Sequence, residues 1–178
     1  MGLEPGDKAA GFNLKNANPD NGGDKVSLGD VVTEQGAIIV FECNHCPYVV
    51  GSIERLEKMA ARARDYGLGF AGINANDAVN YPDDSWENMV KRAEKMSYSY
   101  LHDETQEVAE EWGAERTPEF YLLDGSSTIV YRGRMDDSPS DPTKANTSEL
   151  MDALDAMLMG EKPSVARTRS IGCSVKWK

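Results

Sequence analysis

Short apolar runs alternate along the chain with segments of helical periodicity. Residues 38–41 form a β-branched apolar run, which is typical of a strand buried on both faces. Apolar residues then recur at helical spacing over residues 49–63, with charged residues between them. Because a helix tolerates proline only in its first turn, Pro47 places the predicted start of this helix near Cys43 or Asn44.

The rest of the chain continues the alternation of strands and helices. Further short strands are predicted at residues 12–14, 26–28, 68–73, 98–101, 120–123 and 129–131. Two helices are expected to begin at capping boxes, at residues 84–87 and 103–106. A last helix is expected to begin at Thr147 or Ser148. Since such alternation requires some parallel pairing, the sequence predicts one α/β domain over residues 1–178.

Composition and charge exclude several classes of function. The chain of 178 residues is 40% hydrophobic and 28% charged, which is enough for a packed core. No apolar run approaches the ~18 residues of a membrane span, and no secretion signal is recognised, so a cytoplasmic protein without membrane contact is expected. Thirty acidic against 19 basic residues give a formal net charge of -11. Because this charge repels phosphate backbones, no nucleic-acid partner is expected.

Two of the three cysteines form a Cys-x-x-Cys pair at the predicted junction of the buried strand and the helix. In an intracellular chain such a pair is more often redox-active or metal-binding than structural. A helix N-terminus lowers the pKa of a thiol below the value of about 8.5 for a free cysteine. We therefore expect Cys43 to attack a disulfide and Cys46 to resolve the mixed disulfide. The alternative is that both cysteines are small buried apolar residues.

His45 lies between the two cysteines. When protonated it would stabilise a thiolate and make the pair a stronger oxidant; the alternative is a solvated residue at a helix start. A zinc or copper site with four soft ligands, Cys43, His45, Cys46 and Cys173, is a less favoured alternative, because it needs convergence with one distant cysteine. No organic cofactor is predicted, because the chain lacks a glycine-rich phosphate loop and the cysteines can carry the redox chemistry themselves.

Cys173 belongs to a C-terminal tail, residues 161–178, which shows no helical or strand period before Ile171. An extended chain covers about 3.3 Å per residue, so the tail is long enough to cross the domain. We expect Val175 and Trp177 to dock the tail and Cys173 to be a small packed residue. The alternative is that Cys173 is a second resolving thiol.

Taken in order, these features resemble the thioredoxin fold: a strand, a Cys-x-x-Cys pair opening a helix, a later Thr-Pro before a strand, a hairpin and a closing helix. The two N-terminal strands resemble the peroxiredoxin side of that superfamily, the alkyl-hydroperoxide-reductase-like proteins. The match to peroxiredoxin-like thioredoxin-family proteins covers nearly the whole chain. It is carried by four blocks, at residues 41–49, 117–118, 132–137 and 172–177.

This resemblance implies a thioredoxin-like α/β fold, with a central mixed sheet flanked by helices and an N-terminal β-hairpin extension of peroxiredoxin type in residues 1–34. It implies a cis peptide bond before Pro118, facing the cysteine pair, with the backbone of Thr117 presented to an extended substrate segment. It further implies an oxidoreductase whose partners are a disulfide-containing protein or small thiol substrate and an electron donor of unknown identity.

The chain departs from both family patterns at positions close to the pair. Peroxiredoxins carry a proline and a threonine or serine before the peroxidatic cysteine, where this chain has Gly36 and Val40. Thioredoxins carry a buried acid and a tryptophan there, where this chain has Ala37 and Glu42. The predicted function is thiol–disulfide exchange at the Cys-x-x-Cys pair. The alternatives are an antioxidant thiol peroxidase with Cys43 as peroxidatic cysteine, a metal-binding protein and a redox-inert interaction domain.

Overall fold

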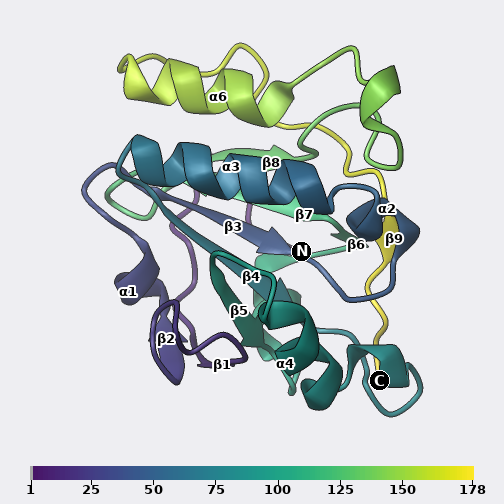
Figure 1. Ribbon diagram of the computed structural model, residues 1–178. Coiled ribbons are helices and arrows are strands. Elements are labelled where there is room, and N and C mark those ends of the chain that lie inside the picture. The colour runs from purple at the N-terminus through teal and green to yellow at the C-terminus, as the bar shows by residue number, and fades with distance from the viewer. Residues whose placement is uncertain (1) are drawn as a thin grey trace.

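A mixed sheet with helices on both faces organises the chain, as the computed structural model of residues 2–178 shows (Figure 1). Its seven strands follow the order β2-β1-β5-β4-β3-β7-β8. Strand β3 pairs in parallel with β4 and antiparallel with β7. The predicted thioredoxin-like fold is thus confirmed. The strands are β1 (Asn13–Asn16), β2 (Lys25–Ser27), β3 (Ala37–Phe41), β4 (Gly69–Asn74), β5 (Ser99–His102), β7 (Glu119–Leu123) and β8 (Ile129–Gly133).

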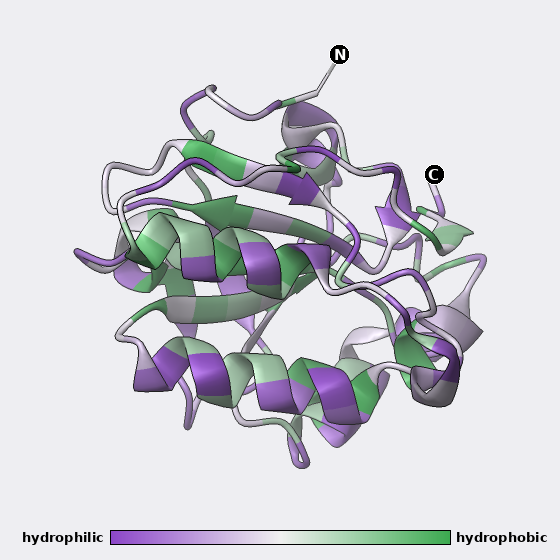
Figure 2. Ribbon diagram, turned by 90° about the horizontal axis from the view of Figure 1, so that it is seen from above, coloured by the Kyte–Doolittle hydropathy of each residue, from purple (hydrophilic) through white to green (hydrophobic). Residues whose placement is uncertain are grey.

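The helices divide between the two faces of the sheet. Helices α3, α4 and α6 pack on one face, while α1 and α5 pack on the other. All five residues of β3 are buried, and they alternate between the two cores. Figure 2 shows hydrophilic and hydrophobic residues alternating along the long helices, as expected for helices with one face on a sheet. The helices are α1 (Leu28–Val31), α2 (Pro47–Val50), α3 (Ile53–Asp65), α4 (Trp86–Ala93), α5 (Glu107–Trp112) and α6 (Glu149–Leu158), with short 3₁₀ turns η1 (Pro82–Asp84) and η2 (Pro142–Lys144).

Both predicted hairpins are present. Strands β1 and β2 pair antiparallel near the N-terminus, and β7 and β8 pair antiparallel later in the chain. The last helix, α6, follows Ser148 as its N-cap, also as predicted. Within residues 2–178, no helix is both long and apolar enough to cross a membrane.

The helix predicted to begin at Cys43 or Asn44 begins later and is interrupted. Helix α2 starts after Cys46, which is its N-cap, and α3 starts after Ser52. The predicted start is wrong because the backbone N–H of Asn44 is bound by the Asp84 carboxylate at 2.7 Å, outside any helix. Pro47 then takes the first helical position, which its fixed φ favours.

The two predicted capping boxes place the helix starts slightly too early. Ser85, not Asp84, caps α4, since the Ser85 hydroxyl accepts from the N–H of Asn88 at 3.3 Å. Helix α5 begins after Gln106, and the Asp103 carboxylate accepts hydrogen bonds from N–H groups in its first turn. Asp84 therefore does not cap α4, and its carboxylate instead binds the backbone of Asn44, next to Cys43.

The C-terminal tail passes beside the loop formed by Thr117 and Pro118. Strand β9 (Cys173–Ser174) pairs antiparallel with β6 (Arg116–Thr117), and Figure 1 shows this last part of the chain, in yellow, passing α2 and β6. Val175 is buried, so its predicted docking role is confirmed. The same prediction for Trp177 is wrong, because 47% of this residue is exposed. The backbone of the tail instead donates hydrogen bonds to Glu115, Asn76 and Gln106.

Candidate active site

The Cys-x-x-Cys pair follows the buried strand β3 and lies against Thr117. Cys43 and Cys46 are each only 1% exposed. The Sγ atom of Cys43 lies 3.5 Å from Thr117 Oγ1, and the Sγ atom of Cys46 lies 3.5 Å from the Thr117 carbonyl oxygen. The bond between Thr117 and Pro118 is cis, as the resemblance implied. The structure thus brings together the pair and the loop that the sequence singled out.

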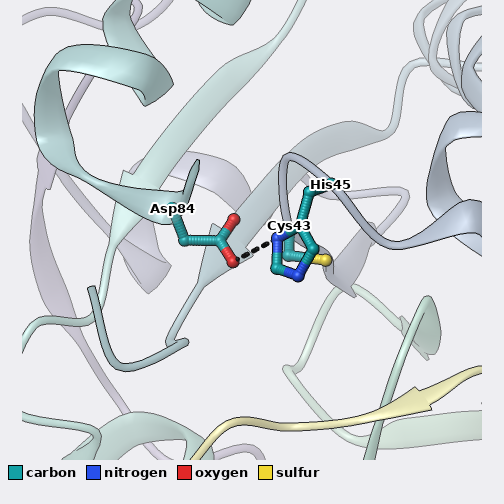
Figure 3. Close-up of side chains that lie close together, drawn as sticks. All are labelled: Cys43, His45 and Asp84. Atoms are coloured by element: carbon teal, nitrogen blue, oxygen red, sulfur yellow. Dashed lines mark ion pairs between the residues drawn. The ribbon is translucent and has the colours of Figure 1, made fainter. Parts of the chain in front are cut away.

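A buried carboxylate that the sequence analysis did not assign to the site lies next to His45. Asp84 in η1 has no exposed side-chain surface, and its Oδ2 atom lies 2.8 Å from His45 Nδ1, whose side chain is 32% exposed. Figure 3 shows the imidazole between this carboxylate and the Cys43 sulfur. Asp84 also accepts hydrogen bonds from the backbone N–H of Asn44 and the side-chain amides of Asn74 and Asn76. Such donors compensate the burial of the carboxylate and fix its position.

The sequence did contain a signal for part of this group. Asn74 and Asn76 follow a predicted buried strand, and polar residues at the carboxyl end of parallel strands meet at one edge of the sheet. The cysteine pair follows the neighbouring parallel strand, β3. The role of Asp84 was not predicted, because Asp84 and Glu87 fit a capping box and Asp84 was therefore assigned to a helix start.

A second buried ionic group holds the backbone of Cys43. Arg92 from α4 places Nη2 at 2.6 Å from Glu42 Oε1 and donates from Nη1 to the Cys43 carbonyl oxygen at 2.9 Å. The hydroxyl of Tyr98 donates to Glu42 Oε2 at 2.9 Å. Burial raises the pKa of Glu42, while Arg92 and Tyr98 oppose that rise. Because each of these groups has a partner, the network orients the segment that carries Cys43.

The two thiols of the pair titrate as a unit, and their interaction shifts their pKa values in opposite directions. The pKa of Cys46 is lowered to about 4, by the Cys43 thiol first and also by Cys173 and the N–H of Val49, while burial opposes this shift. The interaction with Cys46, followed by burial, raises the pKa of Cys43. The expectation that Cys43 lies at a helix start is wrong, because Cys46 takes the N-cap position.

Cys173 lies directly against Cys46. The register of β9 on β6 places Cys173 opposite Thr117. Cys173 packs against the core cluster that contains Cys43 and Cys46, and it contributes to lowering the pKa of Cys46. Cys173 is partly exposed, in contrast to the buried pair. The strand that the resemblance assigns to a substrate segment is thus paired here with the tail of the same chain.

The four-ligand metal set that the sequence analysis gave as a less favoured alternative does not form in residues 2–178. Cys43, His45 and Asp84 each offer one ligand atom, all within 4.8 Å of one another, whereas Cys46 and Cys173 do not belong to this cluster. Structural zinc sites take four ligands. Since His45 and Asp84 already lie at ion-pair distance, we interpret the cluster as a charge network around a thiol.

Comparisons with known proteins identify the group to which the chain is similar. The model of the AhpC/TSA family matches residues 5–132. An uncharacterised conserved protein from Geobacillus kaustophilus is 41% identical, covering 99% of this chain and 93% of that chain with a TM-score of 0.89. A hypothetical protein from Sinorhizobium meliloti 1021 is 32% identical, covering 100% and 97% with a TM-score of 0.89.

A more distant solved structure shows the fold alone. A reduced 2-Cys peroxiredoxin from Plasmodium vivax is 14% identical, and the match covers 88% of this chain and 83% of that chain with a TM-score of 0.62. No curated protein matches the chain.

Proposed function

Because the chain belongs to the AhpC/TSA family, whose members are oxidoreductases that act through thiols, we propose that it is a thiol–disulfide oxidoreductase in which Cys43 and Cys46 carry the two electrons. The observation that carries the proposal is the sulfur geometry: two buried thiols lie against the same threonine, with Cys43 Sγ 3.5 Å from Thr117 Oγ1 and Cys46 Sγ 3.5 Å from the Thr117 carbonyl oxygen. The substrates are disulfides of proteins or small molecules. The cysteines are themselves the redox centre, so the reaction uses no organic cofactor.

Cys43 is the attacking sulfur in this proposal because it lies beside His45 (Figure 3). Its neighbour His45 is partly exposed, whereas Cys46 is covered by Thr117 and Cys173. Cys43 loses its proton to Cys46, and the resulting Cys43 thiolate attacks the substrate disulfide. A bond forms between Cys43 and one substrate sulfur, the substrate S–S bond breaks, and the departing thiolate takes a proton from water.

Cys46 completes the reaction as the resolving thiol. It loses its proton, attacks Cys43 Sγ and expels the second substrate thiolate, which takes up that proton. Two electrons leave the pair, and a Cys43–Cys46 disulfide remains for an external thiol donor to reduce. The segment that carries Cys43 and Cys46 packs against the loop formed by Thr117 and Pro118.

Turnover of a protein disulfide by single-cysteine variants tests this assignment. Reduction of insulin by dithiothreitol should be accelerated by the wild-type protein and lost in both Cys43→Ser and Cys46→Ser. The Cys43→Ser variant should form no mixed disulfide with the substrate, whereas Cys46→Ser should accumulate one on Cys43, because nothing resolves it. Full acceleration by the Cys43→Ser variant would refute the proposal.

A thiol peroxidase is the second candidate, and one contact favours it. The Thr117 hydroxyl lies 3.5 Å from Cys43 Sγ and offers the hydroxyl group that Val40 lacks. In that reaction a peroxide oxidises Cys43 to a sulfenic acid, and Cys46 condenses with it to a disulfide and water. The peroxidase is the weaker candidate because the chain has Gly36 and Val40 where peroxiredoxins carry the proline and the threonine or serine before the peroxidatic cysteine. Rapid consumption of one equivalent of hydrogen peroxide by the reduced protein would reverse the order.

A further inference from the structure

We propose that Cys173 is a third redox-active thiol, which takes over the disulfide from the Cys43–Cys46 pair by bonding to Cys46. This inference rests on the proposed function and adds one step to it. It assigns the C-terminal tail a place in the reaction, between the buried pair and the external thiol that reduces it.

The tail packs closely against the loop formed by Thr117 and Pro118. A Cβ atom on Gly172 would lie 2.0 Å from the Thr117 carbonyl oxygen, so only glycine permits this approach. Arg116 Nη1 donates to the Gly172 carbonyl oxygen at 3.2 Å, and the N–H of Val175 donates to the Glu115 carbonyl oxygen at 3.0 Å. These contacts fix the residues on both sides of Cys173.

The last residues of the tail are anchored as well. The N–H of Lys176 donates to Asn76 Oδ1 at 2.9 Å, and Gln106 Nε2 donates to the Lys176 carbonyl oxygen at 2.8 Å. The N–H of Lys178 donates to Gln106 Oε1 at 3.0 Å. Asn76 also binds the Asp84 carboxylate, so the tail is joined to the charge network beside Cys43.

The register of the tail places three sulfurs around one threonine. Directly opposed residues of an antiparallel pair have Cβ atoms about 5 Å apart on the same face, which puts the Cys173 side chain beside that of Thr117. Cys46 Sγ lies 3.5 Å from the Thr117 carbonyl oxygen, and Cys173 packs against the core cluster that contains the pair. Both other thiols shift the pKa of Cys46, so we take Cys46 as the middle sulfur of the three. Cys43 and Cys46 are 1% exposed, whereas Cys173 is partly exposed, so a thiol arriving from solvent meets Cys173 first.

The added step is an internal thiol–disulfide exchange. The Cys173 thiolate attacks Cys46 Sγ in the Cys43–Cys46 disulfide. A Cys46–Cys173 bond forms, the Cys43–Cys46 bond breaks, and Cys43 leaves with the electron pair and takes up the proton that Cys173 lost. The step conserves electrons and needs no further oxidant. Cys43 becomes free beside His45, and an external dithiol reduces the new disulfide at the exposed tail.

The charges around Cys173 change in favour of this step when the pair is oxidised. In the reduced protein the pKa of Cys173 is raised to about 11, by burial first and then by its hydrogen bond to Cys46 and the charge of Cys46. Both contributions from Cys46 vanish once Cys46 is in a disulfide. Lys176 and Arg116, which lower the pKa of Cys173, remain. Cys173 thus ionises more readily when there is a disulfide to attack.

Disulfide mapping of the full chain tests the inference. Trypsin releases Cys43 and Cys46 together in peptide 26–55 and Cys173 in peptide 170–176. The reduced Cys43→Ser variant is oxidised with one equivalent of diamide, quenched in acid and digested without reduction. We expect peptides 26–55 and 170–176 to be joined in most molecules. The matched variant Cys46→Ser should lose this cross-link, because it lacks the middle sulfur.

Two further samples separate failure of the inference from failure of the proposed function. The Cys173→Ser variant should form the disulfide within peptide 26–55. In the wild-type protein, early time points should show that same internal disulfide and later ones the cross-linked peptides. The inference is overturned if the wild-type protein and the Cys43→Ser variant both lack the cross-link while Cys173→Ser still oxidises within peptide 26–55. The proposed function is intact in that case. If Cys173→Ser also fails to oxidise within that peptide, the proposed function falls with it.

Discussion

Replacing Gly172 by alanine should detach the tail from the cis-proline loop. The added Cβ would lie 2.0 Å from the carbonyl oxygen of Thr117 and 2.7 Å from its carbonyl carbon. Both atoms belong to the backbone of β6, which carries the hydroxyl that contacts Cys43, so neither can move without disturbing the site. The tail, which pairs with β6 through only two residues of β9, is the part that can give way.

The size of the effect follows from the overlap. Forcing an extra carbon into a packed contact costs about 1–3 kcal/mol, and each 1.4 kcal/mol is tenfold in an equilibrium constant. The detached form of the tail should therefore become roughly 5- to 150-fold more populated in Gly172→Ala. Global stability should change less, because the cost is relieved by local opening.

Hydrogen exchange and alkylation measure this opening. The backbone amides of Val175, Lys176 and Lys178, which donate hydrogen bonds in the tail, should exchange faster in Gly172→Ala. Cys46 should also react faster with iodoacetamide, because Cys173 no longer covers it. Gly11→Ala is the matched control, since a Cβ there meets no atom within 4 Å. Exchange and alkylation rates equal to those of the control would refute the view that the tail is seated on Thr117.

Two further predictions concern the pair and its charge network. Because the pKa of Cys46 is held near 4, the thiolate absorbance of the reduced protein should persist as the pH falls from 7 and vanish only as the pH approaches that value; a loss near the pKa of a free thiol, about 8.5, would refute the charge assignment. Asp84→Asn should destabilise the protein by about 1–3 kcal/mol in thermal unfolding, because the N–H groups of Asn44, Asn74 and Asn76 lose an acceptor. Substitution of the exposed neighbour, Asp83→Asn, should change stability little. Equal effects of the two substitutions would show that Asp84 does not hold these donors in place.

Much of the fold could be predicted because the local signals were strong. The apolar run of β3 has no polar residue to bury, so only a central strand accommodates it. The turn residues before Ile129 indicated a hairpin, and the helical spacing of apolar residues indicated α6. The start of α2 was missed because Pro47 is compatible with several positions in a first turn, and only the tertiary contact between Asn44 and Asp84 selects among them.

The residues around the sulfurs were predictable only in part. The cysteines and the cis-proline loop carry a motif, but Asp84 and Cys173 reach the site from segments far away in sequence. Nothing local distinguishes Gly172 from an ordinary turn glycine until Thr117 is placed against it. The charge on Cys46 likewise depends on donors from the tail and from α2, which the sequence alone does not bring together.

The most direct test of the central claim is a redox titration of the Cys173→Ser variant, in which Cys43 and Cys46 are the only thiols left. The protein is equilibrated with glutathione buffers of graded potential, quenched in acid and mapped for free thiols. The account predicts one two-electron transition, in which both cysteines lose their free thiols together and a disulfide forms within peptide 26–55. A stable glutathione adduct on Cys43 with Cys46 still free, or no oxidation across the whole range of buffers, would contradict it.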